Sequence, residues 1–439
     1  MQKKVALIIL FLFFINIFAI PVYAQSPQIN SPSVILIDSA TGRILYEKNS
    51  HEKMYPASIT KIMTAILALE KGNLNDIVTA SSEAVLSVDA GGSNVGILPG
   101  EELSLENLLY ALMISSANES ANVIAEHIAG SIDEFVKLMN QRAAELGAKD
   151  TYFVNTNGLH DDRHVTTAYD MALISRHAMT IPKFREIANT SYYEIQPTNK
   201  YNEKRYLSNT NHLINKYRAT RYYNYLYEPA IGIKTGYTSK ANHTLVAAAK
   251  KNGLELITVV MGSKLDGMKY QSYEDTINLF EYGFNNFGMQ TIVKPGDIID
   301  EVKVMDAKAN EHVILLAEQA LTALLPNNVD KNTIQKEVYP LSNIKAPINK
   351  GDVLGFATYK YQDQVLGKVN LVADRNVEQE PIVIVKNKTI SILNSLWFRV
   401  LTGVIGSVLV ILVILRIARR KKKYSFSRNK VRYIRNKKW

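Results

Sequence analysis

The sequence predicts an α+β protein that ends in one membrane-spanning helix. Strand-like segments occur at both ends of residues 25–293 and enclose a block of helices, which predicts one antiparallel sheet with helices packed on it. Short β-type segments follow in residues 294–377, and an uncharged apolar run occupies residues 400–415. The chain has 439 residues, 47% of them hydrophobic and 21% charged, which suits two or three folded domains and excludes disorder throughout.

The first 24 residues have the features of a secretory signal peptide. Lys3 and Lys4 provide a positive start, and residues 5–20 are apolar except for Asn16. Ala24 supplies a small residue at the expected cleavage site. Because the apolar run is rather long, a first membrane anchor is the alternative.

Residues 25–293 are predicted to form the first domain. Two strands at 33–38 and 43–47 open it, and a helix at 54–71 follows with apolar residues on one face. Further helices are expected at 104–113, 119–129, 132–146 and 167–179, then strands at 231–234, 244–250 and 255–261, and a last helix at 269–284.

Residues 294–377 are predicted to form a small all-β domain. Its strands are expected at 298–304, 313–316, 333–339, 353–359 and 365–372. A stalk at 378–395, a transmembrane helix at 396–417 and a basic cytoplasmic tail at 418–439 complete the predicted order. The uncharged core of that helix would span about 24 Å, slightly less than a hydrocarbon layer of about 30 Å.

The net charge of +10 comes from the two ends of the chain. Twelve Lys or Arg residues lie in 416–439, and Lys3 and Lys4 lie in the leader, with no acidic residue in either segment. The remaining 37 basic residues face all 41 acidic ones, so the body is mildly acidic and is not expected to bind nucleic acid. By the positive-inside rule, the basic tail is cytoplasmic and everything before the helix is extracytoplasmic.

Ser58 and Lys61 form the first candidate for chemistry. Residues three apart on a helix share a face, so the hydroxyl and the amine can meet. A serine hydroxyl becomes a good nucleophile only when a neighbour takes its proton, and a desolvated, neutral amine can do so. The spacing alone is weakly specific, because it recurs at Ser50, Ser342 and Ser427.

Two further short motifs carry suitable side chains. Ser116 and Asn118 offer a hydroxyl that can relay a proton and an amide that can bind a substrate carbonyl, although Ser120 begins a second Ser-Ala-Asn and a helix cap would explain either. On a predicted strand, residues 234–236 read Lys-Thr-Gly, which occurs once in the chain. They combine a positive charge, a hydroxyl and a glycine that permits close approach.

The order of these three motifs resembles that of the penicillin-interacting serine enzymes. Over about residues 30–380 the chain is similar to the low-molecular-mass penicillin-binding proteins, the serine-type D-Ala-D-Ala carboxypeptidases of peptidase family S11. The resemblance implies a β-lactamase/transpeptidase-like catalytic domain followed by the family's second, β-rich domain. Ala117 and Glu119 stand where Gly and Asp are commoner. The predicted membrane span also departs from several relatives, which use an amphipathic helix.

The resemblance also implies roles for individual residues. Ser58 would be the nucleophile, Lys61 its base, and Ser116 the relay of a proton to the leaving amine. Asn118 would hold a carbonyl of the substrate, and Lys234 and Thr235 would bind its terminal carboxylate. Gly236 and Tyr237 complete the expected substrate-binding residues. The backbone N–H groups of Ser58 and Tyr237 would surround the oxyanion. The substrate would be the peptidoglycan pentapeptide stem, and β-lactams would acylate Ser58.

Neither a metal nor another cofactor is expected. The chain has no Cys, and its eight His residues form no zinc-binding pattern such as H-E-x-x-H. Two alternatives to the carboxypeptidase stay open. A class A β-lactamase would need a deacylating glutamate, for which no Glu-x-x-Leu-Asn segment is present between residues 126 and 234. A catalytically inactive wall-binding protein would not need three intact motifs.

Overall fold

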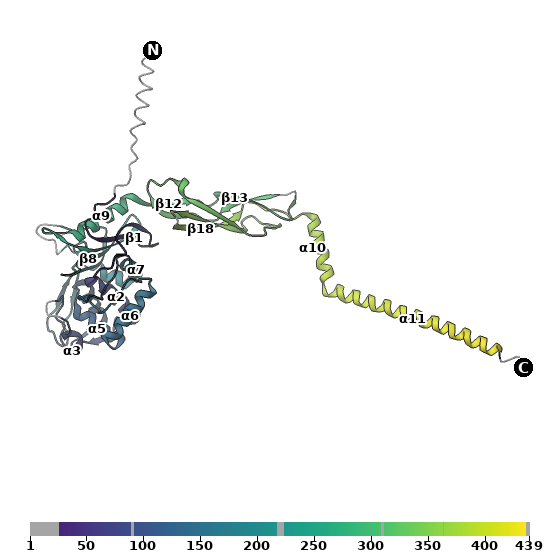
Figure 1. Ribbon diagram of the computed structural model, residues 1–439, viewed down its shortest axis with the longest axis horizontal. Helices are drawn as coiled ribbons and strands as arrows, with labels where there is room; N and C mark the ends of the chain where they lie inside the picture. Colours follow the sequence, from purple (N-terminus) through teal and green to yellow (C-terminus); the bar gives the residue numbers. More distant parts are fainter. Residues whose placement is uncertain (1–25, 89–91, 217–223, 309–310, 363, 436–439) are drawn as a thin grey trace, which may run out of the picture. The chain divides into compact units, whose positions relative to one another are not determined.

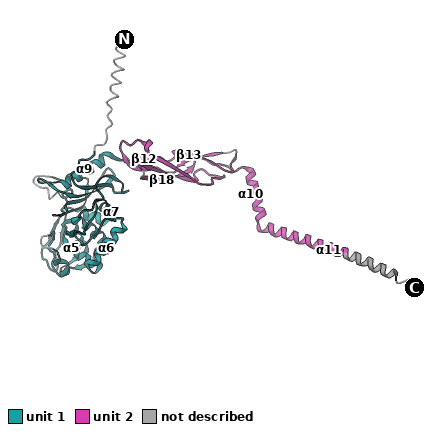
Figure 2. Ribbon diagram, viewed as in Figure 1, with its two compact units in different colours: residues 1–288 teal, residues 289–439 magenta. Residues whose placement is uncertain are grey.

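The computed structural model describes residues 26–88, 92–216, 224–308, 311–362 and 364–435, with side chains described up to Arg420. The predicted signal peptide lies outside the described residues. The chain divides into two compact units, with the boundary between Gly288 and Met289 (Figure 2).

Unit 1 is built on a five-stranded antiparallel sheet in the order β2-β1-β9-β8-β7. The strands of the predicted pattern come from both ends of the unit, as expected. Their bounds are β1 (Ser33–Asp38), β2 (Ile44–Lys48), β7 (Ala230–Thr238), β8 (Asn242–Lys251) and β9 (Leu254–Ser263).

Helices cover both faces of this sheet (Figure 1). Side chains alternate along β1, so Ile35 and Ile37 join the large core of unit 1, whereas Leu36 lies against Gly283 of the last helix, α9 (Gln271–Asn286). The other face carries α2 (Lys61–Lys71), α4 (Leu105–Ile114), α5 (Asn118–Ala129), α6 (Ile132–Glu145), α7 (Ala168–Ala178) and α8 (Pro182–Ala188).

The predicted helix at 54–71 begins later than expected. Met54 exchanges both backbone hydrogen bonds with Thr166, which keeps this segment extended. A 3₁₀ turn, η1 (Ala57–Thr60), follows Pro56, and α2 begins only at Lys61. The predicted last helix also starts two residues late, because β11 (Lys269–Tyr270) pairs with β10 (Leu265–Asp266).

Several short elements of unit 1 were not predicted. They are β3 (Ile77–Thr79), α3 (Ser82–Leu86), β4 (Glu102–Ser104), α8, β5 (Tyr192–Ile195), β6 (Arg205–Ser208) and the β10–β11 pair. β3 pairs with β4, and β5 pairs with β6.

Unit 2 contains a second five-stranded antiparallel sheet in the order β13-β14-β18-β17-β16. All five of its strands were predicted, whereas the two-stranded pair β12 and β15 was not. The bounds are β12 (Phe287–Val293), β13 (Ile298–Lys303), β14 (His312–Ala317), β15 (Leu321–Pro326), a 3₁₀ turn η4 (Lys331–Thr333), β16 (Gln335–Pro340), β17 (Val353–Tyr361) and β18 (Gln364–Ala373). Because β12 pairs with β15, unit 2 begins a few residues before the expected position 294.

Two helices end the described chain, α10 (Pro381–Asn394) and α11 (Leu396–Arg435). The predicted stalk is thus largely helical. Within α11, the segment Leu396–Arg420 contains an 18-residue window with a mean hydropathy of 2.6, and in the described part of the chain it is the one helix long and apolar enough to cross a membrane.

Candidate active site

Ser58 and Lys61 meet as their spacing predicts. The Nζ atom of Lys61, the first residue of α2, lies 2.9 Å from the Oγ atom of Ser58 in the preceding turn. Ala57, directly before Ser58, has a φ of 52°, a left-handed conformation that costs energy for a residue with a side chain. The surrounding fold therefore keeps Ala57 in this unfavourable conformation and fixes the turn that carries Ser58.

The amine of Lys61 has two further partners. It donates to Oδ1 of Asn118 at 2.7 Å and to the backbone carbonyl of Asn157 at 2.8 Å. Lys61 is fully buried, and burial lowers its pKa well below the usual value. The nearby charge of Lys234 lowers the pKa of Lys61 further, while Glu119 opposes the shift. The structure therefore favours a neutral amine beside Ser58.

The second motif lies where α4 gives way to α5. Ser116 has a φ of 62°, again left-handed, and Asn118 is the first residue of α5. The competing Ser-Ala-Asn has structural roles, because Ser120 donates to the carbonyl of Leu108 and Asn122 donates to the carbonyl of Ala84. The geometry thus agrees with the family resemblance, which favours Ser116 and Asn118 over the second copy of the motif.

Alternation along β7 places its residues on opposite faces of the sheet. Gly236 faces the nucleophile, because a Cβ atom there would lie 2.8 Å from the backbone N of Ser58 and would also collide with Oγ1 of Thr244. Lys234, on the same face, is 1% exposed and donates to the carbonyl of Thr235 at 3.0 Å. Burial lowers the pKa of Lys234 to about 7.

A cleft of about 570 Å³ opens over these residues. Six predicted site residues line it: Ser58, Ser116, Asn118, Thr235, Gly236 and Tyr237. Lys61 and Lys234 do not line the cleft and lie beneath its surface. The two lysines can therefore act on the cleft chiefly through their charge and their hydrogen bonds.

The loop that precedes β4 forms another part of the cleft wall through Ser93, which the sequence did not indicate. Two bonds tie this loop to the start of α5. The backbone N–H of Asn118 donates to the carbonyl of Ser93 at 2.9 Å, and the backbone N–H of Val95 donates to Oε1 of Glu119 at 2.7 Å. Glu119 therefore positions this wall.

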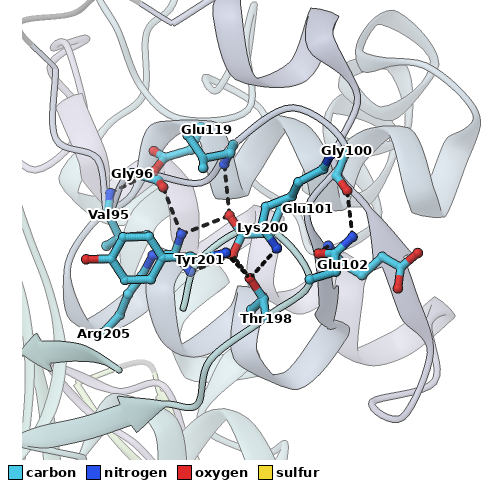
Figure 3. A network of polar contacts seen from close by, with 12 residues as sticks. Val95, Gly96, Gly100, Glu101, Glu102, Glu119, Thr198, Lys200, Tyr201 and Arg205 are labelled. Atoms are coloured by element: carbon cyan, nitrogen blue, oxygen red, sulfur yellow. Dashed lines mark hydrogen bonds and ion pairs between the residues drawn. The ribbon is translucent and has the colours of Figure 1, made fainter. Parts of the chain in front are cut away.

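A buried ion pair holds the other end of the same loop (Figure 3). Arg205 of β6 donates to both carboxylate oxygens of Glu101, at 2.6 and 2.8 Å, and to the carbonyl of Gly96 at 2.9 Å. Thr198 donates to Glu101 at 2.7 Å, and the guanidinium group stacks over the ring of Tyr201. The β5–β6 hairpin thereby braces the cleft wall.

Thr210 is a further residue that the sequence did not single out. Its hydroxyl oxygen lies 2.7 Å from that of Thr235, so two hydroxyl groups converge at this end of the cleft. Thr210 belongs to a long connection between β6 and β7, where no periodic pattern marks it. Asn157 escaped detection as a site residue because it acts through its backbone carbonyl.

Several histidines have partners that indicate a structural role. His127, His160 and His177 approach Asp76, Asp162 and Glu70, respectively. His164 is buried, accepts from the backbone N–H of Val154 through Nδ1, and lies 3.0 Å from the hydroxyl of Thr60. Burial lowers its pKa to about 4. His212 and His243 differ from these histidines because they line the cleft.

Among the described residues, no group of three or more His, Cys, Asp or Glu side chains is arranged to hold a metal ion.

Comparison with known families identifies the fold and the activity. A model of the peptidase S11 family, described as D-alanyl-D-alanine carboxypeptidase, matches residues 21–265. The chain belongs to this family. A model of the penicillin-binding protein 5 C-terminal domain matches residues 287–379, which covers the β-rich part of unit 2. The predicted family and fold class are confirmed.

Named relatives agree over most of their length. D-alanyl-D-alanine carboxypeptidase DacF of Bacillus subtilis is 34% identical over 363 residues, which are 81% of this chain and 88% of that protein. DacC of Escherichia coli is 30% identical over 387 residues, covering 86% of this chain and 89% of that protein. The crystal structure of penicillin-binding protein 5 from Haemophilus influenzae superimposes with a TM-score of 0.61 at 27% identity, covering 81% of this chain and 99% of that one.

This S11 chain is therefore a serine-type D-Ala-D-Ala carboxypeptidase, which removes the terminal D-Ala from peptidoglycan pentapeptide stems. Nothing in these comparisons favours a β-lactamase or an inactive wall-binding protein. A peptidoglycan stem substrate and binding of β-lactams fit the family.

Proposed function

We propose that Ser58 is the acylated nucleophile of this carboxypeptidase and that neutral Lys61 is its base. One observation carries the proposal: the buried amine has three neighbours in hydrogen-bonding range, Ser58, Asn118 and the Asn157 carbonyl. A neutral amine has two N–H donors and one lone pair. Asn118 and Asn157 offer acceptors to both donors, which leaves the lone pair for the Ser58 hydroxyl proton.

The reaction then follows from the positions of these groups. Ser58 Oγ attacks the carbonyl carbon between the two D-Ala residues, and its proton passes to Lys61. The oxyanion that forms is stabilised by the backbone N–H groups of Ser58 and Tyr237. Collapse breaks the C–N bond, the leaving amine gains a proton through Ser116, and an acyl-enzyme remains. Water hydrolyses the ester and returns Ser58 to its starting state.

Substrate binding is divided among the walls of the cleft. Asn118 holds the substrate's peptide carbonyl, and the hydroxyl of Thr235 binds the terminal carboxylate, with Lys234 supplying positive charge from beneath the strand. Gly236 allows β7 to approach the turn that carries Ser58. A β-lactam resembles the dipeptide and forms a slowly hydrolysed ester with the same serine.

Two assays on the same preparation test these roles. Wild-type protein is incubated with a fluorescent penicillin, and D-Ala release from a pentapeptide is followed in parallel. The expected result is covalent labelling and D-Ala release by the wild type, and neither by Ser58→Ala. Ser120→Ala serves as the matched control, because its hydroxyl only donates to the Leu108 carbonyl. Labelling of Ser58→Ala would refute the assignment.

We also propose a topology for the chain. Residues 1–24 are a signal peptide, residues 25–293 are the catalytic domain, residues 294–377 are the β-rich domain and residues 378–395 are the stalk. Residues 396–417 cross the cell membrane, with the catalytic domain outside and the basic tail of residues 418–439 in the cytoplasm. The uncharged apolar segment of α11 and the cations that follow it support this orientation.

Extraction of membranes with alkaline carbonate tests the span. We expect the full-length protein to stay in the pellet and a chain truncated after residue 377 to be released. Recovery of the full-length protein in the supernatant would contradict the proposal. Protease added to intact cells should remove the catalytic domain and spare an epitope placed in the tail, whereas digestion of the tail would contradict the orientation.

A further inference from the structure

Four aromatic side chains form one wall of the cleft, which we call the aromatic wall: His212, His243, Tyr270 and Tyr273. The ring of His212 stacks on Tyr273 with the centroids 5.3 Å apart. The ring of Tyr270 meets His243 edge-on at 5.1 Å and Tyr273 edge-on at 6.0 Å. These spacings are those of interacting aromatic pairs, so the wall is a continuous packed surface.

Three separate elements contribute to this wall. His243 comes from β8, Tyr270 and Tyr273 come from the start of α9 and the residue before it, and His212 comes from the connection between β6 and β7. His243 is paired with Tyr237 across the strands, so it projects on the face of the sheet opposite Lys234 and Gly236. Thr235 projects on that same opposite face, and the aromatic wall therefore adjoins its hydroxyl.

Hydrogen bonds connect the aromatic wall to the backbone of Thr210, whose hydroxyl lies against that of Thr235. The Tyr273 hydroxyl donates to the backbone carbonyl of Thr210 at 3.2 Å, and the backbone N–H of His212 donates to that same Tyr273 oxygen at 3.2 Å. The side chain of Thr210 in turn lies 2.7 Å from Thr235. The wall thus begins at the place where the proposed function puts the terminal carboxylate.

We propose that the aromatic wall is the binding surface for the leaving residue of the substrate and that it restricts this residue to a small, uncharged side chain. The inference rests on the proposed function, in which Thr235 binds the carboxylate of that residue. The side chain on the α-carbon, one bond from the carboxylate, then lies beside the rings. A methyl group contacts them favourably, whereas a longer side chain requires a ring to move.

The lack of charged side chains in the described cleft lining also favours an uncharged leaving residue. The described lining of the cleft contains no Asp, Glu, Lys or Arg side chain. An ionised side chain on the leaving residue would find no opposite charge among these described side chains and would lose part of its hydration, which is costly. The aromatic wall therefore disfavours D-Glu and D-Lys through desolvation and disfavours D-Leu through size.

Tyr270 is the residue with which to test the inference. Its ring lies between His243 and Tyr273, it is only partly buried, and its contacts with them are through the ring. Tyr270→Ala opens the wall, and Tyr270→Phe is the matched control that keeps the ring. The kcat/KM is measured for two pentapeptides that differ only in the last residue, D-Ala or D-Leu, and thermal unfolding confirms that each variant is folded.

The wild type is expected to prefer D-Ala, and Tyr270→Ala is expected to reduce the D-Ala/D-Leu ratio of kcat/KM at least tenfold, mainly through the D-Leu substrate. Tyr270→Phe should keep the wild-type ratio. An unchanged ratio in folded Tyr270→Ala, or a wild type without preference, would overturn the inference. Failure of the proposed function looks different, because the wild type would then release neither residue and Ser58 would not be acylated by penicillin.

Discussion

The ion pair between Arg205 and Glu101 gives a quantitative test of how the cleft wall is held. Glu101 is completely buried, and Arg205 is 6% exposed. Replacement of Arg205 by Met removes the charge and leaves the carboxylate in the interior. Breaking a buried pair in this way typically costs about 3–5 kcal/mol. Because Thr198 and the backbone N–H of Leu98 still donate to Glu101, we expect a loss near the lower end, about 3 kcal/mol.

A double-mutant cycle separates the pair from its surroundings. Glu101→Gln leaves the buried guanidinium group without an opposite charge, so it should also destabilise the protein, whereas the combination with Arg205→Met removes both charges. We expect the double variant to lose less free energy of unfolding than the sum of the single variants by at least about 1 kcal/mol. Urea unfolding followed by loss of fluorescent-penicillin labelling reports on unit 1 specifically. Simple additivity would refute the claim that these two residues stabilise each other.

The pH dependence supplies a second check on the same pair. Burial raises the pKa of Glu101, but the hydrogen bonds from Arg205, Thr198 and Leu98 outweigh it, and the pKa is lowered overall. Stability from this group is thus present above the unfolded pKa and is lost as the pH falls. In Arg205→Met the largest contribution that lowers the pKa of Glu101 is removed, so the difference in free energy of unfolding between the wild type and this variant should narrow from pH 7 to pH 4. A difference in free energy of unfolding that does not change with pH would contradict the electrostatic explanation.

Three further predictions concern the site itself. Lys234→Ala removes a charge that lowers the pKa of Lys61, so the pH at which the acylation rate rises should increase. An unchanged pH profile would contradict an electrostatic interaction between the two lysines. Gly236→Ala places a methyl group against the Ser58 backbone N, and kcat/KM for D-Ala release should fall by about 10²-fold; wild-type kinetics would contradict the close approach. His164 has a pKa of about 4 in the folded protein and near 6.5 in the unfolded chain, so acid favours the unfolded state. Between pH 7 and pH 5, the wild type should lose about 2 kcal/mol more free energy of unfolding than His164→Gln, as measured by urea unfolding. Equal losses in the two proteins would contradict this.

The parts of the site that were predictable are those carried by local spacing. Ser58 and Lys61 are three residues apart, and the turn between them brings the two atoms together whether it is α-helical or 3₁₀. The order of the five sheet strands and of the longer helices in unit 1 also followed from periodicity, because their apolar residues repeat every two or every three to four positions. The start of α2 did not follow, since the pairing of Met54 with Thr166 depends on a segment far along the chain.

The parts that were not predictable depend on tertiary contacts. Thr210 gains its significance only because it lies opposite Thr235, and nothing in its immediate sequence indicates this. The aromatic wall draws on residues 212, 243, 270 and 273, whose types are common in cores and whose spacing is irregular. Glu119 looked like a mild substitution in the sequence, whereas the structure shows its carboxylate holding Val95.

The strand order of unit 1 also governs when the protein can fold. β1 lies between β2 and β9, with Ser33 opposite Met261, so the centre of the sheet joins segments from the two ends of the unit. Contacts so distant in sequence slow folding, because a long loop must close before they form. Until β9 is available, the β1–β2 hairpin keeps one apolar edge open to other chains. Gly236 lies against Ser58 in the folded sheet, so we expect activity to appear only after the segments from the two ends of unit 1 have paired.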